Sequence, residues 1–162
     1  MHPRCASKSR SHCMKNHYTL RFRADLDLLM GADMEVERWL DQSSAPRSSV
    51  HWVRLVLEEL GAHTIKYGGG EVDTVAIEVT VRRETWGTAI EYRDNGLACD
   101  PFSVPSYDLD LPVEQRPIQG LGIHLIRKMS DHIAYGWKDG WNCLRLEKLT
   151  RGATECPKLS VE

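Results

Sequence analysis

The sequence lacks the features that mark membrane-spanning, secreted and nucleic-acid-binding proteins. No apolar run approaches the roughly 20 residues of a membrane-spanning helix, and the polar, basic N-terminus lacks the apolar segment of a secretory signal. The 21 lysines and arginines are balanced by 23 aspartates and glutamates, so no bulk field attracts nucleic acid or an anionic membrane. The 162 residues suffice for one domain. We expect a cytoplasmic protein with no membrane or nucleic-acid partner.

Cysteine is present in an odd number and never in close pairs. The five cysteines are scattered and none forms a CxxC motif, which argues against both a disulfide framework and a zinc site. Cys5 and Cys13 lie near His2 and His12 in the sequence, but nothing around them would hold a rigid metal geometry. Cys99 has no neighbouring histidine or basic pair, so it is interpreted as a plain loop thiol.

Hydrophobic periodicity predicts three helices and five strands in the order β-α-α-β-β-loop-α-β-β. The predicted strands are residues 18–23, 74–82, 87–92, 133–137 and 142–149, and the predicted helices are 24–40, 55–68 and 123–131. Strands that follow one another through short turns favour a mainly antiparallel mixed sheet with all three helices on one face. The expected fold class is therefore α+β, a two-layer sandwich.

The patterned segments extend over residues 17–149, which are predicted to form the folded domain. Residues 1–16 have low hydrophobicity and are predicted to be a disordered N-terminal extension, and residues 150–162 a C-terminal tail. Residues 97–119 form a long stretch without periodicity. A loop of this length inside a compact domain is typically functional, and it is interpreted as a lid.

The predicted helix 55–68 carries the first candidate site residues. Its apolar residues recur at helical intervals, and three consecutive glycines at 68–70 end it. On such a helix, Glu59 and His63 lie one turn apart on the same face. The pair is either a solvated surface salt bridge or an acid and a ligand or acid–base group that project together into a site.

Two glycine-containing motifs follow at the ends of predicted elements. Asp94 and Gly96 lie at a strand end, where an aspartate can accept a hydrogen bond from an exocyclic amine and glycine lets a flat ring approach the backbone. Gly120, Leu121 and Gly122 open the last helix, whose free N–H groups favour phosphates. Each motif alone is also typical of an ordinary turn or of packing. Their order, with a carboxylate on another helix, predicts a nucleotide pocket.

These motifs together resemble one known family. The segments are LVLEELGAHTIKYG (residues 55–68), EYRDNGLACDP (91–101) and QRPIQGLGIHLIRKMSD (115–131). They resemble the N box and the two glycine boxes of the GHKL ATP-binding superfamily, and within it the small single-domain anti-sigma factor serine kinases of bacteria. The late segment YGWKDGWNCLRLEK resembles the closing hairpin of that family, so the resemblance covers about residues 17–149.

The resemblance implies the Bergerat ATP-binding fold and a set of site residues. Asp94 would recognise the adenine of ATP, with Gly96 beside the ring. Glu59 would be the catalytic base that takes the proton from a serine of a partner protein. The phosphates would be bound by the residues that open the last helix: Gly120, Leu121, Gly122 and His124.

The same resemblance implies a regulatory serine/threonine-protein kinase, a transferase in a bacterial partner-switching system that controls transcription. Its expected substrate is a serine on a small STAS-type anti-sigma-factor antagonist. A sigma factor is a second expected partner, and a homodimer is expected, for which the exposed side of the sheet is a candidate surface. The ATPase domain of a histidine sensor kinase is a weaker alternative, because no phosphoacceptor helical domain precedes these motifs.

One residue departs from the resembled pattern where a metal is expected. The N box places an asparagine that binds Mg²⁺ one turn after the glutamate, and this chain has His63 there. Mg²⁺ prefers oxygen ligands in octahedral geometry, so imidazole is a poor replacement. His63 thus binds another metal, contacts phosphate when protonated, or marks a catalytically degenerate nucleotide-binding regulator that sequesters a protein partner. ATP is the expected cofactor in each case, and Mg²⁺ depends on His63.

Three residues of the last predicted helix have two interpretations each. His124 either faces the phosphates or lies at the surface. Arg127 and Lys128 either reach a phosphate or complement the partial negative charge at the end of their helix.

Overall fold

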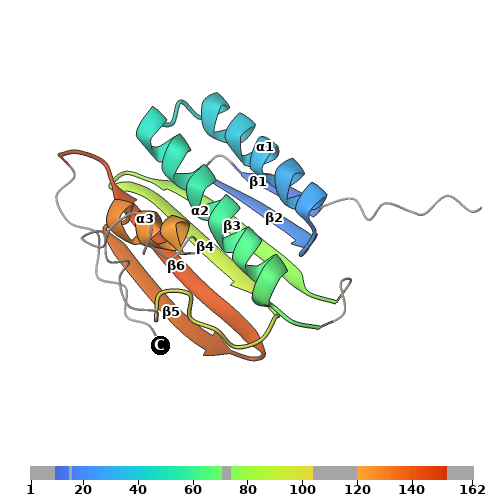
Figure 1. Ribbon diagram of the computed structural model, residues 1–162. Coiled ribbons are helices and arrows are strands. Elements are labelled where there is room, and N and C mark those ends of the chain that lie inside the picture. The colour runs from blue at the N-terminus through green and yellow to red at the C-terminus, as the bar shows by residue number, and fades with distance from the viewer. Residues whose placement is uncertain (1–9, 15, 71–73, 104–119, 153–162) are drawn as a thin grey trace, which may run out of the picture.

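The computed structural model describes residues 10–14, 16–70, 74–103 and 120–152. In chain order the elements are β1 (Arg10–Met14), β2 (His17–Arg23), α1 (Leu26–Gln42), α2 (Arg47–Tyr67), β3 (Ala76–Glu84), β4 (Gly87–Asp94), α3 (Leu121–Met129), β5 (His132–Lys138) and β6 (Trp141–Leu149), as Figure 1 shows. All eight predicted helices and strands are present. Of the predicted lid, residues 104–119 lie outside the described part, as do residues 1–9 and 15 of the predicted extension and 153–162 of the predicted tail.

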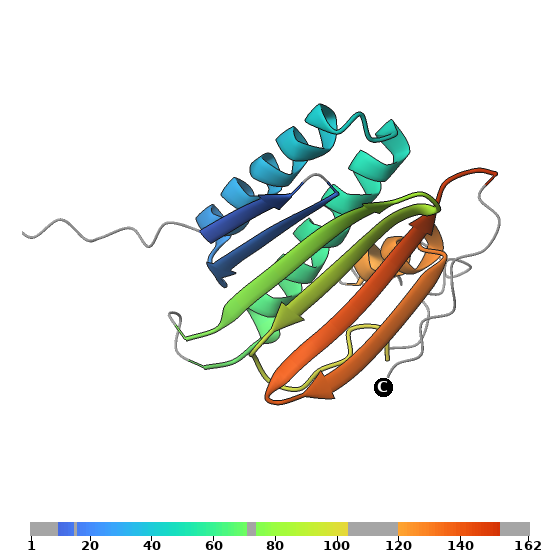
Figure 2. The same cartoon turned by 180° about the vertical axis from the view of Figure 1, so that it is seen from behind.

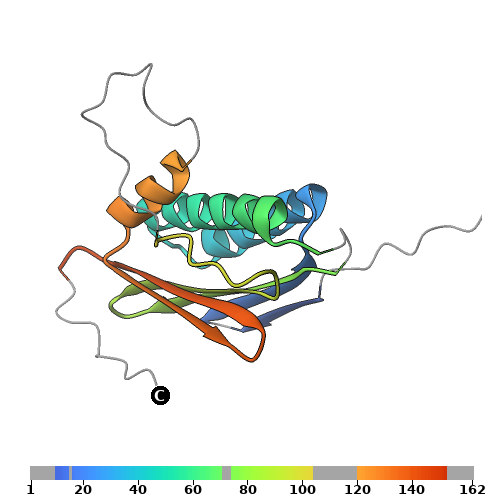
Figure 3. The ribbon, with the colours of Figure 1, turned by 60° about the horizontal axis from the view of Figure 1, so that its bottom comes forward.

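The strands form one six-stranded sheet in the order β1-β2-β3-β4-β6-β5. Figure 3 shows α1, α2 and α3 together on one side of it, so the predicted α+β two-layer sandwich is confirmed. Every described ladder is antiparallel, and the sheet is therefore not mixed in this part of the chain. Strands that are neighbours in the sheet either follow one another in the chain or have two elements between them. Each of these elements reverses the direction of the chain, so every neighbouring pair runs antiparallel.

β1 lies within the stretch that the sequence predicts to be disordered. It pairs antiparallel with β2, with Arg10 opposite Arg21 and Met14 opposite His17. An edge strand gains its backbone hydrogen bonds from a single neighbour, and its side chains need not alternate between apolar and polar. The prediction of a disordered extension is therefore wrong for residues 10–14.

α1 follows the sequence pattern closely. Asp25 caps it: its backbone is extended, and its Oδ1 accepts a hydrogen bond from the backbone N of Leu28 at 3.0 Å. The apolar residues that α1 buries recur at intervals of three and four: Leu29, Ala32, Val36, Trp39 and Leu40.

α2 begins earlier than the sequence predicts. Its first residue is Arg47, directly after Pro46, and no side chain caps it. Ser48 and Ser49 therefore lie inside the helix and do not cap it. Proline suits a helix start, because its fixed φ and missing N–H group cost nothing there. The polar composition of residues 41–49 hides the first three residues of the helix from periodicity, whereas Val50, Trp52 and Val53 continue its apolar pattern.

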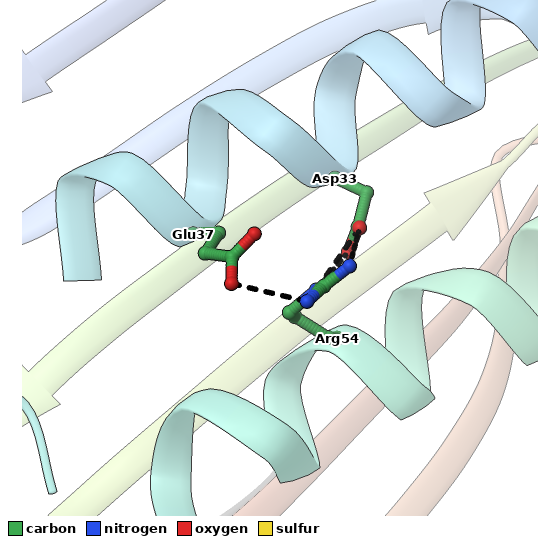
Figure 4. A network of polar contacts seen from close by, with 3 residues as sticks. All are labelled: Asp33, Glu37 and Arg54. Carbon is green, nitrogen blue, oxygen red and sulfur yellow. Dashed lines mark hydrogen bonds and ion pairs between the residues drawn. The ribbon is translucent and has the colours of Figure 1, made fainter. Parts of the chain in front are cut away.

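An ion-pair network fixes α2 against α1 (Figure 4). The Nη2 and Nε atoms of Arg54 on α2 donate to Oδ2 of Asp33 at 2.8 and 3.0 Å, and Nη1 donates to Glu37 at 3.0 Å. Asp33 is buried, so its charge needs this partner. The hydrogen bond to Asp33 is the main cause that raises the pKa of Arg54 above its ordinary value. The network holds in place the helix that carries the candidate site residues.

The two faces of the sheet differ in chemistry. Apolar side chains such as Leu20, Ile77 and Leu146 are buried on the face under the helices. The opposite face, which lies in front of the helices in Figure 2, carries cross-strand pairs of arginine and glutamate. The paired residues are Arg21 and Arg93 with Glu78, and Arg82 and Arg145 with Glu91. This open face is therefore polar. Within the described residues, no helix is both long and apolar enough to cross a membrane.

Candidate nucleotide-binding site

A pocket lies between the C-terminal half of α2, the ends of β4 and β6, and the segment after β4. Asp94, the last residue of β4, lines this pocket and is 5% exposed. Its Oδ1 accepts hydrogen bonds from Gly96 N at 3.0 Å and Asn142 Nδ2 at 2.9 Å, and its Oδ2 accepts one from Thr64 Oγ1 at 3.1 Å. A carboxylate offers about four acceptor positions. Three donors thus orient Asp94 and leave acceptor capacity for a ligand amine.

The buried hydroxyls of Thr64 and Tyr92 link Asp94 to α2. The Thr64 hydroxyl lies 2.8 Å from the hydroxyl of Tyr92, which donates to the carbonyl of Leu60 at 3.1 Å. Burial raises the pKa of Tyr92 far above its ordinary value, so the phenol stays protonated and remains a donor. One turn of α2 therefore positions the pocket carboxylate.

Gly96 lies in the predicted pocket region and is required by a close backbone approach. A Cβ at this position would lie 2.8 Å from both Cα and O of Gly68, the residue that ends α2. The next residue, Leu97, donates its backbone N–H to the same carbonyl at 2.7 Å. Glycine thus lets the chain that leaves β4 pass against the end of α2 and form the pocket wall. Its predicted position beside a bound ring stays a prediction.

Glu59 and Gly122 meet where α3 packs on α2. A Cβ on Gly122 would lie 1.9 Å from Cδ and from Oε2 of Glu59, so only glycine leaves room for the carboxylate at the first turn of α3. Burial raises the pKa of Glu59 above its ordinary value, and the neighbouring charge of Glu58 adds to the increase. A carboxylate with a raised pKa is a stronger base once ionised. The candidate base therefore lies beside the predicted phosphate-binding helix start.

The start of α3 has the backbone chemistry that the sequence predicts. Gly120 precedes the helix with a φ of 96°, in the left-handed region that glycine adopts without strain. Leu121 is exposed, whereas His124 is only 7% exposed. The interpretation of His124 as a surface residue is therefore wrong. His124 lies on the first turn and donates its backbone N–H to Gly120 at 3.0 Å, next to the N–H groups that favour an anion.

His63 lines the same pocket as Asp94, one turn after Glu59 on α2. Its ring centroid lies 4.9 Å from that of Tyr67, at an interplanar angle of 51°. Burial lowers the pKa of His63 below its ordinary value of 6.5, and the charge of Asp94 opposes this shift. The imidazole is therefore neutral near pH 7.

The donor set around His63 does not suit Mg²⁺. In the part of the chain that the structure describes, no group of three or more His, Cys, Asp or Glu side chains is arranged to hold a metal ion. Mg²⁺ requires oxygen ligands, which phosphate-transfer sites supply from one or two carboxylates and from the phosphates themselves. Glu59 is such an oxygen donor, but His63 offers nitrogen. A metal role for His63 stays a prediction without a matching set of ligands.

Arg127 makes a contact that neither of its predicted interpretations includes. Its guanidinium donates to the carbonyl of Phe102, which ties α3 to the segment that follows β4. In the same segment, Phe102 N donates to Asp100 Oδ1 at 2.9 Å. Cys99 lines the pocket and is a free, exposed thiol, in agreement with its interpretation as a loop thiol.

Sequence analysis does not single out three residues that position Asp94. Thr64 and Tyr92 fall on the apolar faces of their elements, so periodicity assigns them to the core. Asn142 lies 48 residues after Asp94, and only the pairing of β4 with β6 places the two side by side. The one available signal is a polar residue at an inward-facing position of a predicted strand.

Comparisons with known proteins add a family to this geometry. The family model described as the histidine kinase-like ATPase domain matches residues 22–148, a range that includes all the site residues above. The serine/threonine-protein kinase BtrW of Bordetella bronchiseptica is 32% identical over 71 residues, which are 44% of this chain and 50% of that protein. The chain thus matches about half the length of this relative. The family match covers most of the chain, and the protein belongs to the histidine kinase-like ATPase domain family, whose members bind ATP.

Proposed function

We propose that this protein is an ATP-dependent protein-serine kinase whose substrate is a serine on a small antagonist protein of a bacterial partner-switching system. Membership of the ATPase family supports ATP as the phosphate donor. The relative's name, serine/threonine-protein kinase, supports protein phosphorylation. A STAS-type antagonist and a sigma factor as partners, and a homodimer, are proposed on the resemblance of the motifs alone.

The contact between Glu59 and Gly122 is the observation that carries this proposal. It puts a carboxylate with a raised pKa at a glycine-opened helix start, where the helix dipole and free N–H groups attract phosphate. Thr64, which holds Asp94, follows Glu59 by five residues on α2, or about 7–8 Å along the helix axis. One rigid helix thus carries the candidate base and also orients the carboxylate that would recognise adenine.

Each residue then has one task. Asp94 accepts a hydrogen bond from the adenine amine, and the first N–H groups of α3 bind the phosphates. Bound ATP supplies the phosphoryl group. Glu59 accepts the proton of the substrate serine while the serine oxygen bonds to the terminal phosphorus and the bond to the leaving ADP breaks. His63 does not act as a metal ligand in this step.

Glu59→Gln tests the proposal, with Glu58→Gln as the matched control on the same helix. Glu58 is exposed, and its substitution leaves the Glu59 carboxylate in place. The measurements are ADP affinity by calorimetry and transfer of labelled phosphate from ATP to a STAS-type antagonist. We expect Glu59→Gln to reduce transfer by at least about 100-fold and to bind ADP nearly as the unmodified protein does. We expect Glu58→Gln to retain ADP binding and most of the transfer, because burial, more than the charge of Glu58, raises the pKa of Glu59.

Two results would contradict the proposal in different ways. Full transfer by Glu59→Gln would mean that another group accepts the serine proton. Absence of ADP binding by the unmodified protein would mean that the pocket is not a nucleotide site.

A second candidate function is favoured by His63. A regulator that binds a nucleotide and sequesters a protein partner needs no Mg²⁺ ligand at this position. Calorimetric titration of ADP, with Mg²⁺ and then with EDTA, separates the two functions when it is repeated with His63→Asn. Mg²⁺-dependent binding by the unmodified protein favours the kinase. Metal-independent binding that becomes Mg²⁺-dependent in His63→Asn favours the sequestering regulator.

A further inference from the structure

Asn142 uses its whole hydrogen-bonding capacity inside the protein. Its Nδ2 donates to Asp94 Oδ1 and to the Leu97 carbonyl, both at 2.9 Å. Its Oδ1 accepts from Cys99 N at 3.0 Å and from the Tyr135 hydroxyl at 2.9 Å. An amide side chain has two donor hydrogens and two acceptor lone pairs, and Asn142 is only 3% exposed. It therefore has no donor or acceptor to offer a ligand, and its task is to hold its neighbours.

These partners determine the orientation of the amide. Exchange of its oxygen and nitrogen would put an acceptor against the Asp94 carboxylate and the Leu97 carbonyl, and an NH₂ group against the Cys99 N–H. A donor thus always faces Asp94. The contact is also built into the sheet, because Asp94 and Asn142 are opposite each other in the pairing of β4 with β6.

The same amide holds the pocket wall. Leu97 and Cys99 belong to the segment after β4, and both line the pocket with Asp94. Their backbone groups bond to Asn142 rather than to one another. The Asn142 side chain therefore fixes the position of Asp94, the acceptor at the base of the pocket. It also fixes the distance between Asp94 and the pocket wall that Leu97 and Cys99 form.

We propose that Asn142 is a positioning residue that holds Asp94 as an oriented acceptor, and so gives the pocket its preference for 6-amino purines over 6-oxo purines. This inference rests on the proposed function, in which the pocket binds an adenine nucleotide. An ionised carboxylate accepts a hydrogen bond from a 6-amino group and repels a 6-oxo oxygen. The amide donor opposite Oδ1 fixes the direction in which this acceptor points.

Asn142→Asp is the direct test, because it changes the donor that faces Asp94 and keeps the acceptor that faces Cys99 and Tyr135. The new carboxylate removes a donor from Asp94 Oδ1 and puts an acceptor against it, so Asp94 loses the contact that orients it toward a ligand amine. Asn95→Asp is the matched control: Asn95 is exposed, and its Oδ1 accepts from Ala76 N at 2.6 Å, away from the pocket.

The readout is the affinity of each protein for ADP and for IDP, its 6-oxo analogue, measured by calorimetry at neutral pH. The unmodified protein is expected to prefer ADP by at least about tenfold, the value of one charge-assisted hydrogen bond. In Asn142→Asp we expect the ADP affinity to fall by about tenfold or more and the IDP affinity to change by less than about threefold. Asn95→Asp is expected to change neither.

If Asn142 has a purely structural role, Asn142→Asp weakens the binding of ADP and of IDP equally. That result would overturn the inference and leave the nucleotide site in place. If the unmodified protein binds ADP without preference over IDP, the inference is also wrong. If it binds neither, the proposed function itself fails. Asn142→Ala, which removes both donors and admits water, must show the same selective loss of ADP and serves if Asn142→Asp does not fold.

Discussion

Gly122→Ala tests the contact between α2 and α3 through stability and needs no substrate. The added methyl group would lie 1.9 Å from Cδ and Oε2 of Glu59 and 2.5 Å from its Cγ, and these are its three nearest atoms. The obstacle is thus one flexible side chain, not the backbone. Gly122 lies within α3, where alanine is a compatible residue. We expect Glu59 to swing away while both helices keep their places.

Two effects of similar size then oppose each other. Replacing a helical glycine by alanine stabilises by up to about 1 kcal/mol. Moving the half-buried Glu59 away from the N-terminus of α3 costs roughly 1 kcal/mol in dipole interaction and rotamer strain. The free energy of unfolding of Gly122→Ala should therefore stay within about 1 kcal/mol of the unmodified protein. In a Glu59→Ala background the obstacle is gone, and the same substitution should stabilise by the full helix term of about 1 kcal/mol.

Urea unfolding of the four proteins in this cycle measures the coupling. Gly31→Ala is the matched control, because Gly31 lies in α1 and a Cβ there would meet nothing within 4 Å. Gly31→Ala should raise the free energy of unfolding equally in the unmodified protein and in Glu59→Ala. If Gly122→Ala also has the same effect in both, Glu59 does not occupy the space beside Gly122 and the site geometry is wrong. The single substitution should also abolish most ATP turnover, since it displaces the candidate base.

Three further substitutions test the surroundings of the site. Arg54→Met leaves the buried carboxylate of Asp33 unpaired and should lower the free energy of unfolding by about 1–2 kcal/mol, a value reduced because Arg54 is partly exposed. Thr64→Val removes a donor to Asp94 and should weaken ADP binding by about tenfold in calorimetry. His63 has a lowered pKa, so just below pH 6.5 the unfolded chain binds more protons than the native one and stability falls on acidification. His63→Asn should remove that part of the pH dependence of urea unfolding.

Each of these has a matched control in the chain. Arg38→Met changes an exposed arginine of α1, Thr80→Val changes a threonine that bonds to Thr19 at 3.0 Å on the open face of the sheet, and His51→Asn changes an exposed histidine of α2. The contact proposed for Arg54, Thr64 or His63 is refuted when its control has an equal effect on the measured quantity.

Local patterns predict the fold where apolar periodicity is strong. The cap at Asp25 and the alternation in β3 and β4 belong to single segments, so they can be recognised without knowing what packs against them. β1 cannot be recognised in this way, because its strand state comes from backbone pairing with β2. The start of α2, residues 47–54, is missed in part for a related reason: Arg47, Ser48 and Ser49 are polar, and tertiary context overrides their weak helix propensity. Val50, Trp52 and Val53 are buried and continue the apolar pattern of the helix.

Individual site residues are more predictable than the bonds between them. Asp94, Gly120 and Gly122 stand at ends of elements, where residue type and position suggest a task. The contact of Gly122 with Glu59 depends on how α3 packs on α2, and periodicity contains no information about that packing. Likewise, the bond from Asn142 to Asp94 depends on the register of two strands far apart in sequence.

His63 decides between the two proposed functions because it lies on a rigid element. Glu59, His63 and Thr64 share one helix, so their spacing is set by helix geometry. A neutral imidazole can donate one hydrogen bond to a phosphate oxygen but gives Mg²⁺ no oxygen ligand. In the proposed function, recognition of adenine depends on Asp94 and on Thr64, which donates to it, and His63 takes no part in that contact. Nucleotide binding should therefore survive where transfer does not, and His63→Asn separates the two.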